Sequence, residues 1–303
     1  MSSTSPDDTT EVGSYFISNY PPFSFWNKEH LPAALDALQT APQERSPIGL
    51  YLHIPFCRKR CKFCYFRVYT DKNSKEIERY VSALGREAEL YQELPGVRGR
   101  PFKFVYFGGG TPSYLSAKQL RGLVDRLRNS IGWDDAEEVT FECEPGTLNQ
   151  GKLEAIREIG VTRLSLGVEN FNDEILEENG RAHRSPECLE AYGWARELAF
   201  DQINIDLISG MVGETEENWK DTVRRALELQ PECLTIYQME LPFNTIYTQE
   251  GVGGTGAVAN WETKRRWVDY AFGEFKAAGY SQSSAYTVVR DADTKFVYRD
   301  ALW

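Results

Sequence analysis

The sequence of 303 residues lacks any apolar run that could span a bilayer. Its apolar runs, such as 104–107, are far shorter than the roughly 20 residues that a transmembrane helix needs. The start of the chain, Met1–Asp8, also lacks the basic and apolar segments of a secretory signal. These absences predict a cytoplasmic protein without a membrane span.

Basic residues are also fewer than acidic ones. Lys and Arg number 34 against 45 Asp and Glu, which gives a formal charge of -11. Such a chain lacks the overall attraction that dominates nucleic-acid binding, so we expect no nucleic-acid partner. Basic residues interleave with one cysteine cluster, where they either solvate a loop or attract an anionic substrate: Arg58, Lys59, Arg60, Lys62 and Arg67.

Cysteine is also infrequent, with six residues in the whole chain. A chain of this length without a secretory signal is not expected to form disulfides. Three cysteines stand alone on expected strands or helices and are typical of small buried hydrophobic residues: Cys143, Cys188 and Cys233. The other three, Cys57, Cys61 and Cys64, lie within eight residues.

Residues 47–285 alternate short β-branched or aromatic runs with stretches of helical periodicity. Six such repeats predict a parallel sheet with right-handed crossovers. No G-x-G-x-x-G motif follows the first strand, which disfavours a dinucleotide-binding sheet. We predict an α/β fold, a partial TIM-like (β/α)6 barrel with its chemistry at the C-terminal strand ends. The expected strands are 49–54, 102–107, 138–142, 163–167, 202–207 and 233–238, and the expected helices 76–90, 116–131, 151–159, 185–198, 216–229 and 261–278.

Two further segments flank this predicted barrel. Residues 1–46 form an expected N-terminal extension, whose aromatic stretch over 15–26 either packs on the barrel or binds a partner. Residues 286–303 look structured, and we expect them to be the start of a truncated C-terminal segment.

The cysteine loop carries the clearest chemistry. Cys57-x3-Cys61-x2-Cys64 places three thiols directly after a strand. Structural zinc needs four ligands, and no fourth Cys or His stands nearby except His53, which belongs to the strand. Three cysteines suit a [4Fe–4S] cluster in which one iron lacks a protein ligand and can chelate a small molecule. A zinc-stabilised binding module is the alternative.

The segments around this loop carry a family resemblance. They include Tyr51-x-His53-Ile54-Pro55-Phe56-Cys57 and the run Phe107-Gly108-Gly109-Gly110-Thr111, and further matches lie at 61–64, 164–171 and 204–210. Together they resemble the radical S-adenosylmethionine (SAM) superfamily, and within it the oxygen-independent coproporphyrinogen III oxidases and their relatives, the HemN/HemW group. The resemblance implies a reduced [4Fe–4S] cluster that cleaves SAM into methionine and a radical, which then abstracts hydrogen from a substrate.

The resemblance also implies roles for individual residues. Cys57, Cys61 and Cys64 would ligate the cluster, and Tyr51, the expected catalytic residue, would stand beside it and contact SAM. For the methionine part of SAM, Gly109, Gly110 and Thr111 with Glu142 would contact the ammonium group, and Arg181 would contact the carboxylate. Glu169 and Asp206 would hold the ribose. The adenine would lie against Phe63, Ile208 and Glu240. The oxidases carry Gln at the position of Glu169 and a small residue at that of Glu240.

The subgroup is less defined than the superfamily. The oxidases have a fourth cysteine where this chain has Phe66. The haem chaperones have Phe at that position, but usually Asp at the position of Tyr65. They also carry a His-Asn pair near 296–298 that is absent here. The expected substrate is an anionic tetrapyrrole such as coproporphyrinogen III, or haem, and the expected electron donor is a flavodoxin or ferredoxin. A haem chaperone and a radical SAM methyltransferase or cyclopropanase stay open as alternatives.

Overall fold

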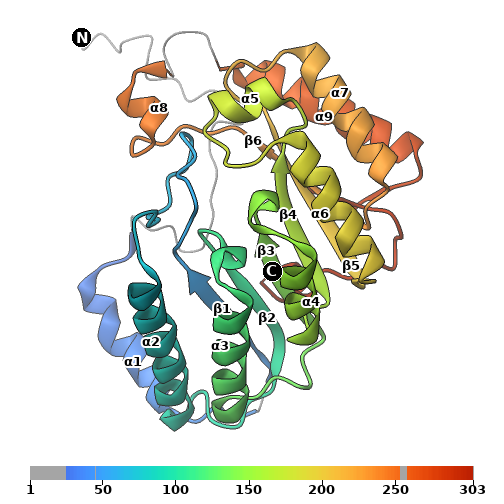
Figure 1. The fold of residues 1–303 in the computed structure, drawn as a ribbon. Coiled ribbons are helices and arrows are strands. Elements are labelled where there is room, and N and C mark those ends of the chain that lie inside the picture. Colours follow the sequence, from blue (N-terminus) through green and yellow to red (C-terminus); the bar gives the residue numbers. More distant parts are fainter. Residues whose placement is uncertain (1–24, 45, 253–257, 303) are drawn as a thin grey trace, which may run out of the picture.

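The computed structural model describes residues 25–44, 46–252 and 258–302 (Figure 1). Most of the predicted N-terminal aromatic stretch lies outside this range. Two of its residues lie inside it, and both are exposed: Phe25 at 67% and Trp26 at 60%. Helix α1 (Leu31–Gln39) follows and buries no residue fully.

The centre of the fold is one eight-stranded sheet in the order β1-β2-β3-β4-β5-β6-β8-β7. The first six strands are parallel, which confirms the predicted α/β architecture. Strand β8 pairs antiparallel with β6, and β7 antiparallel with β8. Strands β1 and β7 stand at opposite ends of this order and do not pair with each other, so the sheet of the described residues is a partial barrel rather than a closed one. The strands are β1 (Ile48–Ile54), β2 (Phe102–Gly109), β3 (Glu138–Cys143), β4 (Arg163–Glu169), β5 (Gln202–Ser209), β6 (Cys233–Gln238), β7 (Ser281–Gln282) and β8 (Thr287–Val289).

Crossover helices cover one side of the sheet. Figure 1 shows α2, α3, α4 and α6 lined up along its outer face. The six predicted helices all form, as α2 (Ser74–Glu93), α3 (Ala117–Ser130), α4 (Gln150–Glu158), α6 (Ser185–Glu197), α7 (Glu216–Leu229) and α9 (Trp261–Ala277). Four shorter turns of helix were not expected from periodicity: α1, α5 (Asp173–Glu178), α8 (Ile246–Gln249) and α10 (Val297–Leu302). Short 3-10 turns form at η3 (Lys28–His30), η4 (Pro112–Tyr114) and η5 (Pro145–Thr147).

Side-chain caps explain where several of these helices begin. Ser116 accepts the backbone N–H of Gln119 at the start of α3, and the Gln119 side chain accepts the N–H of Ser116 in return. Thr215 and Asn218 form the same reciprocal pair at α7. Both helices begin within one residue of their predicted ranges, 116–131 and 216–229. At α6 the predicted Ser185 is the first helical residue, and Arg184 occupies the cap position.

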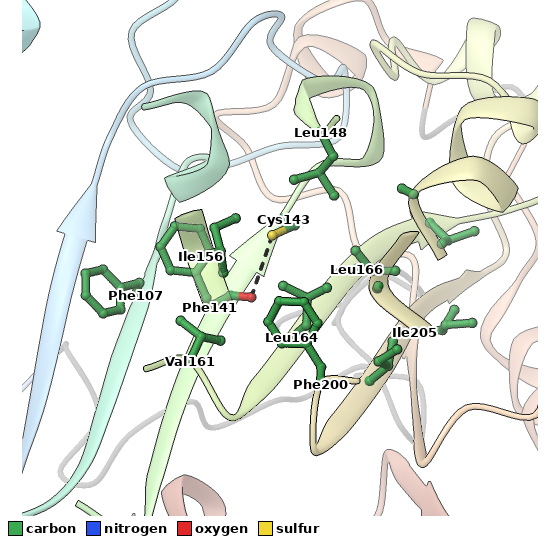
Figure 2. Close-up of a cluster of buried hydrophobic side chains, with 14 of the residues drawn as sticks. Phe107, Phe141, Cys143, Leu148, Ile156, Val161, Leu164, Leu166, Phe200 and Ile205 are labelled. Atoms are coloured by element: carbon green, nitrogen blue, oxygen red, sulfur yellow. Dashed lines mark hydrogen bonds between the residues drawn. The ribbon is translucent and has the colours of Figure 1, made fainter. Parts of the chain in front are cut away.

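Side chains alternate along the strands between two regions, the hydrophobic core beneath the helices and the inside of the partial barrel. Outward-facing residues pack beneath the helices, as Figure 2 shows for Phe107, Phe141, Leu164, Leu166 and Ile205. Each is fully buried, and burial of such a side chain stabilises the fold by about 1.5–3 kcal/mol. The isolated cysteines Cys143, Cys188 and Cys233 are buried, as expected. Inward-facing neighbours on the same strands are mostly polar, and they form the candidate site.

No helix among the described residues is long and apolar enough to cross a membrane. Residues beyond 285 contribute to the same sheet, because β8 pairs with β6. The N-terminus of α10 is held at the start of β3, where Glu138 accepts the backbone N–H of Val297 at 2.8 Å.

Candidate functional site

Two adjoining cavities occupy the interior of the partial barrel. The larger, called here the barrel cavity, has a volume of about 520 Å³ and is lined by inward-facing residues of β2–β6 that include Tyr106, Glu142, Ser165, Asp206 and Tyr237. The smaller, the cysteine cavity, has about 170 Å³ and is lined by Cys57, Cys61 and Cys64. Five residues line both cavities, which makes them neighbours: Phe66, Gly110, Thr111, Glu144 and Arg181.

The cysteine loop begins at the C-terminal end of β1. Backbone bonds between Tyr69 and the pair Pro55 and Cys57 close its base. Cys57 is buried, and Cys61 and Cys64 are half-buried. Burial raises the pKa of the Cys57 thiol to about 11, although a hydrogen bond from Thr111 at 3.3 Å opposes the shift. Without a metal this thiol is therefore protonated at neutral pH, and metal binding would release its proton.

The glycine run at the C-terminal end of β2 allows close approach to this loop. Gly109 has a φ of +118°, which side chains rarely adopt, and a Cβ there would lie 2.7 Å from Nδ1 of His53. A Cβ on Gly110 would lie 2.9 Å from the Sγ of Cys57. These glycines are required because the β2 end packs directly against the cysteine loop.

Three carboxyl groups from adjacent strands face the barrel cavity. Glu142 on β3 accepts the Tyr106 hydroxyl at 2.7 Å and the backbone N–H of Gly109 at 3.3 Å. Asp206 on β5 accepts the Ser165 hydroxyl at 2.8 Å, and burial raises its pKa. Burial also raises the pKa of Glu142 and of Glu169 to about 7 in each case. The group therefore favours a cationic or hydroxyl-rich ligand.

Glu169 occupies an unusual backbone position. Its φ is +65°, and the pairing of β4 with β5 shifts register beside it. A non-glycine residue in this region costs of the order of 1–3 kcal/mol and is frequent at ligand sites. This strained conformation indicates that Glu169 is a candidate functional residue.

Arg181 connects the two cavities. Its Nη1 donates to the Sγ of Cys61 at 3.3 Å, and its Nη2 donates to the carbonyl of Gly167 at 2.6 Å. Nη2 also lies 3.5 Å from the carboxylate of Glu169. Its Nε is buried without a hydrogen-bond partner among the described residues. A buried cation between thiols and acids can position an anionic group of a ligand in that space.

Comparison with known proteins decides the family. The family model described as the radical SAM superfamily matches residues 51–226, which is more than half of the chain. The chain belongs to the radical SAM superfamily. The cofactors expected from the cysteine loop, a [4Fe–4S] cluster and SAM, are those of this superfamily.

Relatives place the chain near the HemN/HemW group, as expected. It is 31% identical to the heme chaperone HemW of Haemophilus influenzae over 203 residues, which cover 66% of this chain and 53% of that protein. It is 33% identical to the oxygen-independent coproporphyrinogen III oxidase of Escherichia coli over 205 residues, which cover 68% and 44% respectively. The chain thus matches about half the length of these relatives.

The fold comparison agrees with the sequence comparison. The structure of coproporphyrinogen III oxidase (HemN) from Escherichia coli matches with a TM-score of 0.80 and 24% identity. The match covers 94% of this chain and 65% of that one. The α/β fold predicted from the strand and helix pattern is confirmed, and it matches the radical SAM fold that the family resemblance implied.

The remaining predicted residues divide into two groups. Phe63 lines the cysteine cavity and Ile208 the barrel cavity, and both pack in one small apolar cluster that includes Met239. Glu240 is exposed and lines neither cavity, so the structure does not bring this expected adenine contact to the site. Tyr51 also lines neither cavity, but its ring stacks on that of Tyr106 with centroids 5.9 Å apart.

Several cavity residues were not predicted as site residues, although Ser165 and Asn204 lie within the matching segments. Tyr106, Ser165, Asn204 and Tyr237 sit at inward positions of strands whose alternate residues are buried and apolar. Their period-two alternation was the signal that could have found them. Arg163 also lines the barrel cavity, with its guanidinium 3.8 Å from the ring of Phe296. No signal in the sequence marks this arginine, because the ring that it contacts lies far along the chain, just before α10.

Proposed function

We propose that this chain is a radical SAM oxidoreductase, coproporphyrinogen III oxidase-like, that acts on an anionic tetrapyrrole. The observation that carries the proposal is the common wall of the two cavities. Gly110, Thr111 and Arg181 contribute to both, so the cysteine loop and the buried carboxyl groups face adjoining spaces. A cluster and a small molecule chelated to it need such an arrangement.

The donor set fits the cluster. In our proposal Cys57, Cys61 and Cys64 each ligate a different iron, which does not require the three thiols to converge on one point. Within the described residues, no group of three or more His, Cys, Asp or Glu is arranged to hold a single metal ion. A structural zinc site needs a fourth Cys or His ligand, whereas a cluster held by three thiols keeps one iron open for a small molecule.

The surroundings fit SAM. In our proposal Gly109, Gly110 and Thr111 line the space for its methionine part, and Glu142 accepts from its ammonium group. Arg181 would pair with its carboxylate, and Glu169 and Asp206 would accept from the ribose hydroxyls. When bound, the reduced cluster supplies the electron that cleaves a carbon–sulfur bond of SAM. The protein holds the reactants in place and excludes water.

The tetrapyrrole substrate is supported by the names of the relatives, which include coproporphyrinogen III oxidases and heme chaperones. The basic residues of the cysteine loop give it less support than expected. Arg58 donates to the carbonyls of Gly146 and Ala182, and Arg60 to that of Cys64, so both hold the loop together. A flavodoxin or ferredoxin as electron donor and a cytoplasmic location are part of the same proposal.

Anaerobic reconstitution followed by product analysis tests the proposal. We expect a brown protein with about four irons per chain. With SAM and dithionite it should release methionine and 5′-deoxyadenosine, and with coproporphyrinogen III also vinyl products and carbon dioxide. A brown protein that leaves SAM intact would contradict the enzymatic proposal. A colourless protein that retains zinc would overturn the cofactor assignment itself.

A haem chaperone is the second candidate, favoured by Phe66. This residue replaces the fourth cysteine of the oxidases, lines both cavities and is 48% exposed. A haem-binding protein on the same scaffold should give a Soret band on titration with haem, without turnover of coproporphyrinogen III. The same reconstituted preparation therefore separates the two candidates.

A further inference from the structure

A buried histidine lies beside the proposed SAM pocket. His183 is fully buried and follows Arg181 by two residues. Its Nδ1 lies 3.0 Å from Oε1 of Glu144, and its Nε2 lies 3.2 Å from the carbonyl oxygen of Val168. Both ring nitrogens therefore face oxygen atoms.

This arrangement restricts the protonation of the pair. A neutral imidazole donates from one nitrogen and presents a lone pair at the other, and a carbonyl oxygen can only accept. A neutral ring would thus leave one lone pair facing an oxygen atom, unless Glu144 carried a proton. The same Oε1 of Glu144 accepts the backbone N–H of Gly146 at 3.1 Å, and Arg58 lies 3.9 Å away. Burial alone would raise the pKa of Glu144, but His183, Arg181 and Arg58 together lower it below its ordinary value.

Burial and the charge of Arg181 lower the pKa of His183 below its ordinary value, although Glu144 and the hydrogen bond to Val168 act to raise it. The hydrogen-bond geometry decides between them, because only a doubly protonated ring satisfies two acceptors in a site closed to water.

We propose that His183 is a doubly protonated positioning residue that donates to Glu144 and Val168 and thereby fixes Arg181 and Glu169 in the SAM pocket. The proposal rests on the function proposed above and adds a residue to which no role had been given. Val168 immediately precedes Glu169, whose φ of +65° must be held against strain. Arg58 extends the network to the cysteine loop, since it neighbours Cys57 and donates to Gly146 at 2.6 Å.

Histidine NMR tests the protonation directly. The chain has three histidines, and ¹⁵N-labelled histidine in the reconstituted protein would give three ring systems. At about pH 7.5, one unit above the ordinary imidazole pKa of about 6.5, we expect His183 to carry protons on both nitrogens. A His183→Gln variant assigns its signals. In Glu144→Gln the ring should become neutral. A neutral His183 in the unsubstituted protein would overturn the proposal.

SAM binding by equilibrium dialysis tests the positioning role. We expect His183→Gln to weaken SAM affinity by about 10- to 100-fold, as loss of a supporting hydrogen bond commonly does. The matched control is His30→Gln, because His30 is exposed on η3 and far along the chain from the pocket. Unchanged affinity in His183→Gln would refute the role. If the unsubstituted protein bound no SAM, the proposed function would fail, whereas the NMR result would still decide the protonation of His183.

Discussion

The close packing of Gly110 against the cysteine loop gives a prediction that can be worked from the structure. In Gly110→Ala the new Cβ would lie 2.9 Å from the Sγ of Cys57, and 3.0 Å from both the carbonyl oxygen of Phe56 and the carbonyl carbon of Pro55. Two of these neighbours are backbone atoms, and Phe56 and Cys57 are buried, so none can turn away cheaply. Overpacking of this kind costs about 1–3 kcal/mol.

The expected consequence is a displaced cluster ligand. The added methyl group would displace the Cys57 side chain and the backbone next to it. The iron content after anaerobic reconstitution should therefore fall well below that of the unsubstituted protein. The melting temperature of the metal-free protein should also drop. Each kcal/mol of lost stability lowers it by about 2–4 °C in proteins of roughly 150–250 residues, and we expect a shift of similar size here.

Gly122→Ala is the matched control. Gly122 lies in α3 and a Cβ there meets no atom within 4 Å, so the same chemical change should stabilise the helix by about 1 kcal/mol. Iron content should not change in this variant. If Gly110→Ala bound iron normally and melted like the control, the tight packing of the glycine run against the cysteine loop would be refuted.

Three further predictions address the ligands, the carboxyl groups and the cofactor contact. Cys61→Ala should abolish the cluster while Cys188→Ala retains it, as measured by iron content; equal losses would show that the ligand assignment is incomplete. Burial in the folded state raises the pKa of Glu142 to about 7, so the folded protein binds this proton more tightly than the unfolded chain does. The unfolding free energy of the metal-free protein should therefore fall as the pH rises from about 4.5 to 7. The loss should reach up to about 3 kcal/mol for this group. Urea titrations across that range should show a flatter profile for Glu142→Gln, and an unchanged slope would contradict the assignment. Arg181→Lys should weaken SAM binding at least tenfold in equilibrium dialysis, because an ammonium group cannot reproduce two directed contacts; normal affinity would exclude Arg181 as the carboxylate partner.

The sequence alone determined the repeating architecture and the cofactor class. Strand and helix periodicity predicted all six parallel strands and their helices, because burial beneath the crossover helices requires apolar residues at regular positions. Helix starts at Ser116 and Thr215 were likewise readable, since capping is local. The spacing of Cys57, Cys61 and Cys64 was informative for the same reason: ligands of one loop are close in sequence as well as in space.

Tertiary structure decided which residues share a cavity. Arg181 lies more than a hundred residues from Cys61, yet the two are in contact, and no local pattern encodes that distance. The structure also left Glu240 outside both cavities and joined His183 to Glu144 and Val168. Contacts of this kind depend on how the ends of several strands meet. The cysteine motif thus predicted the cofactor class. The packing of β3, β4 and the loops after them determined the charge and shape of the cavity in which the cofactors are expected to bind.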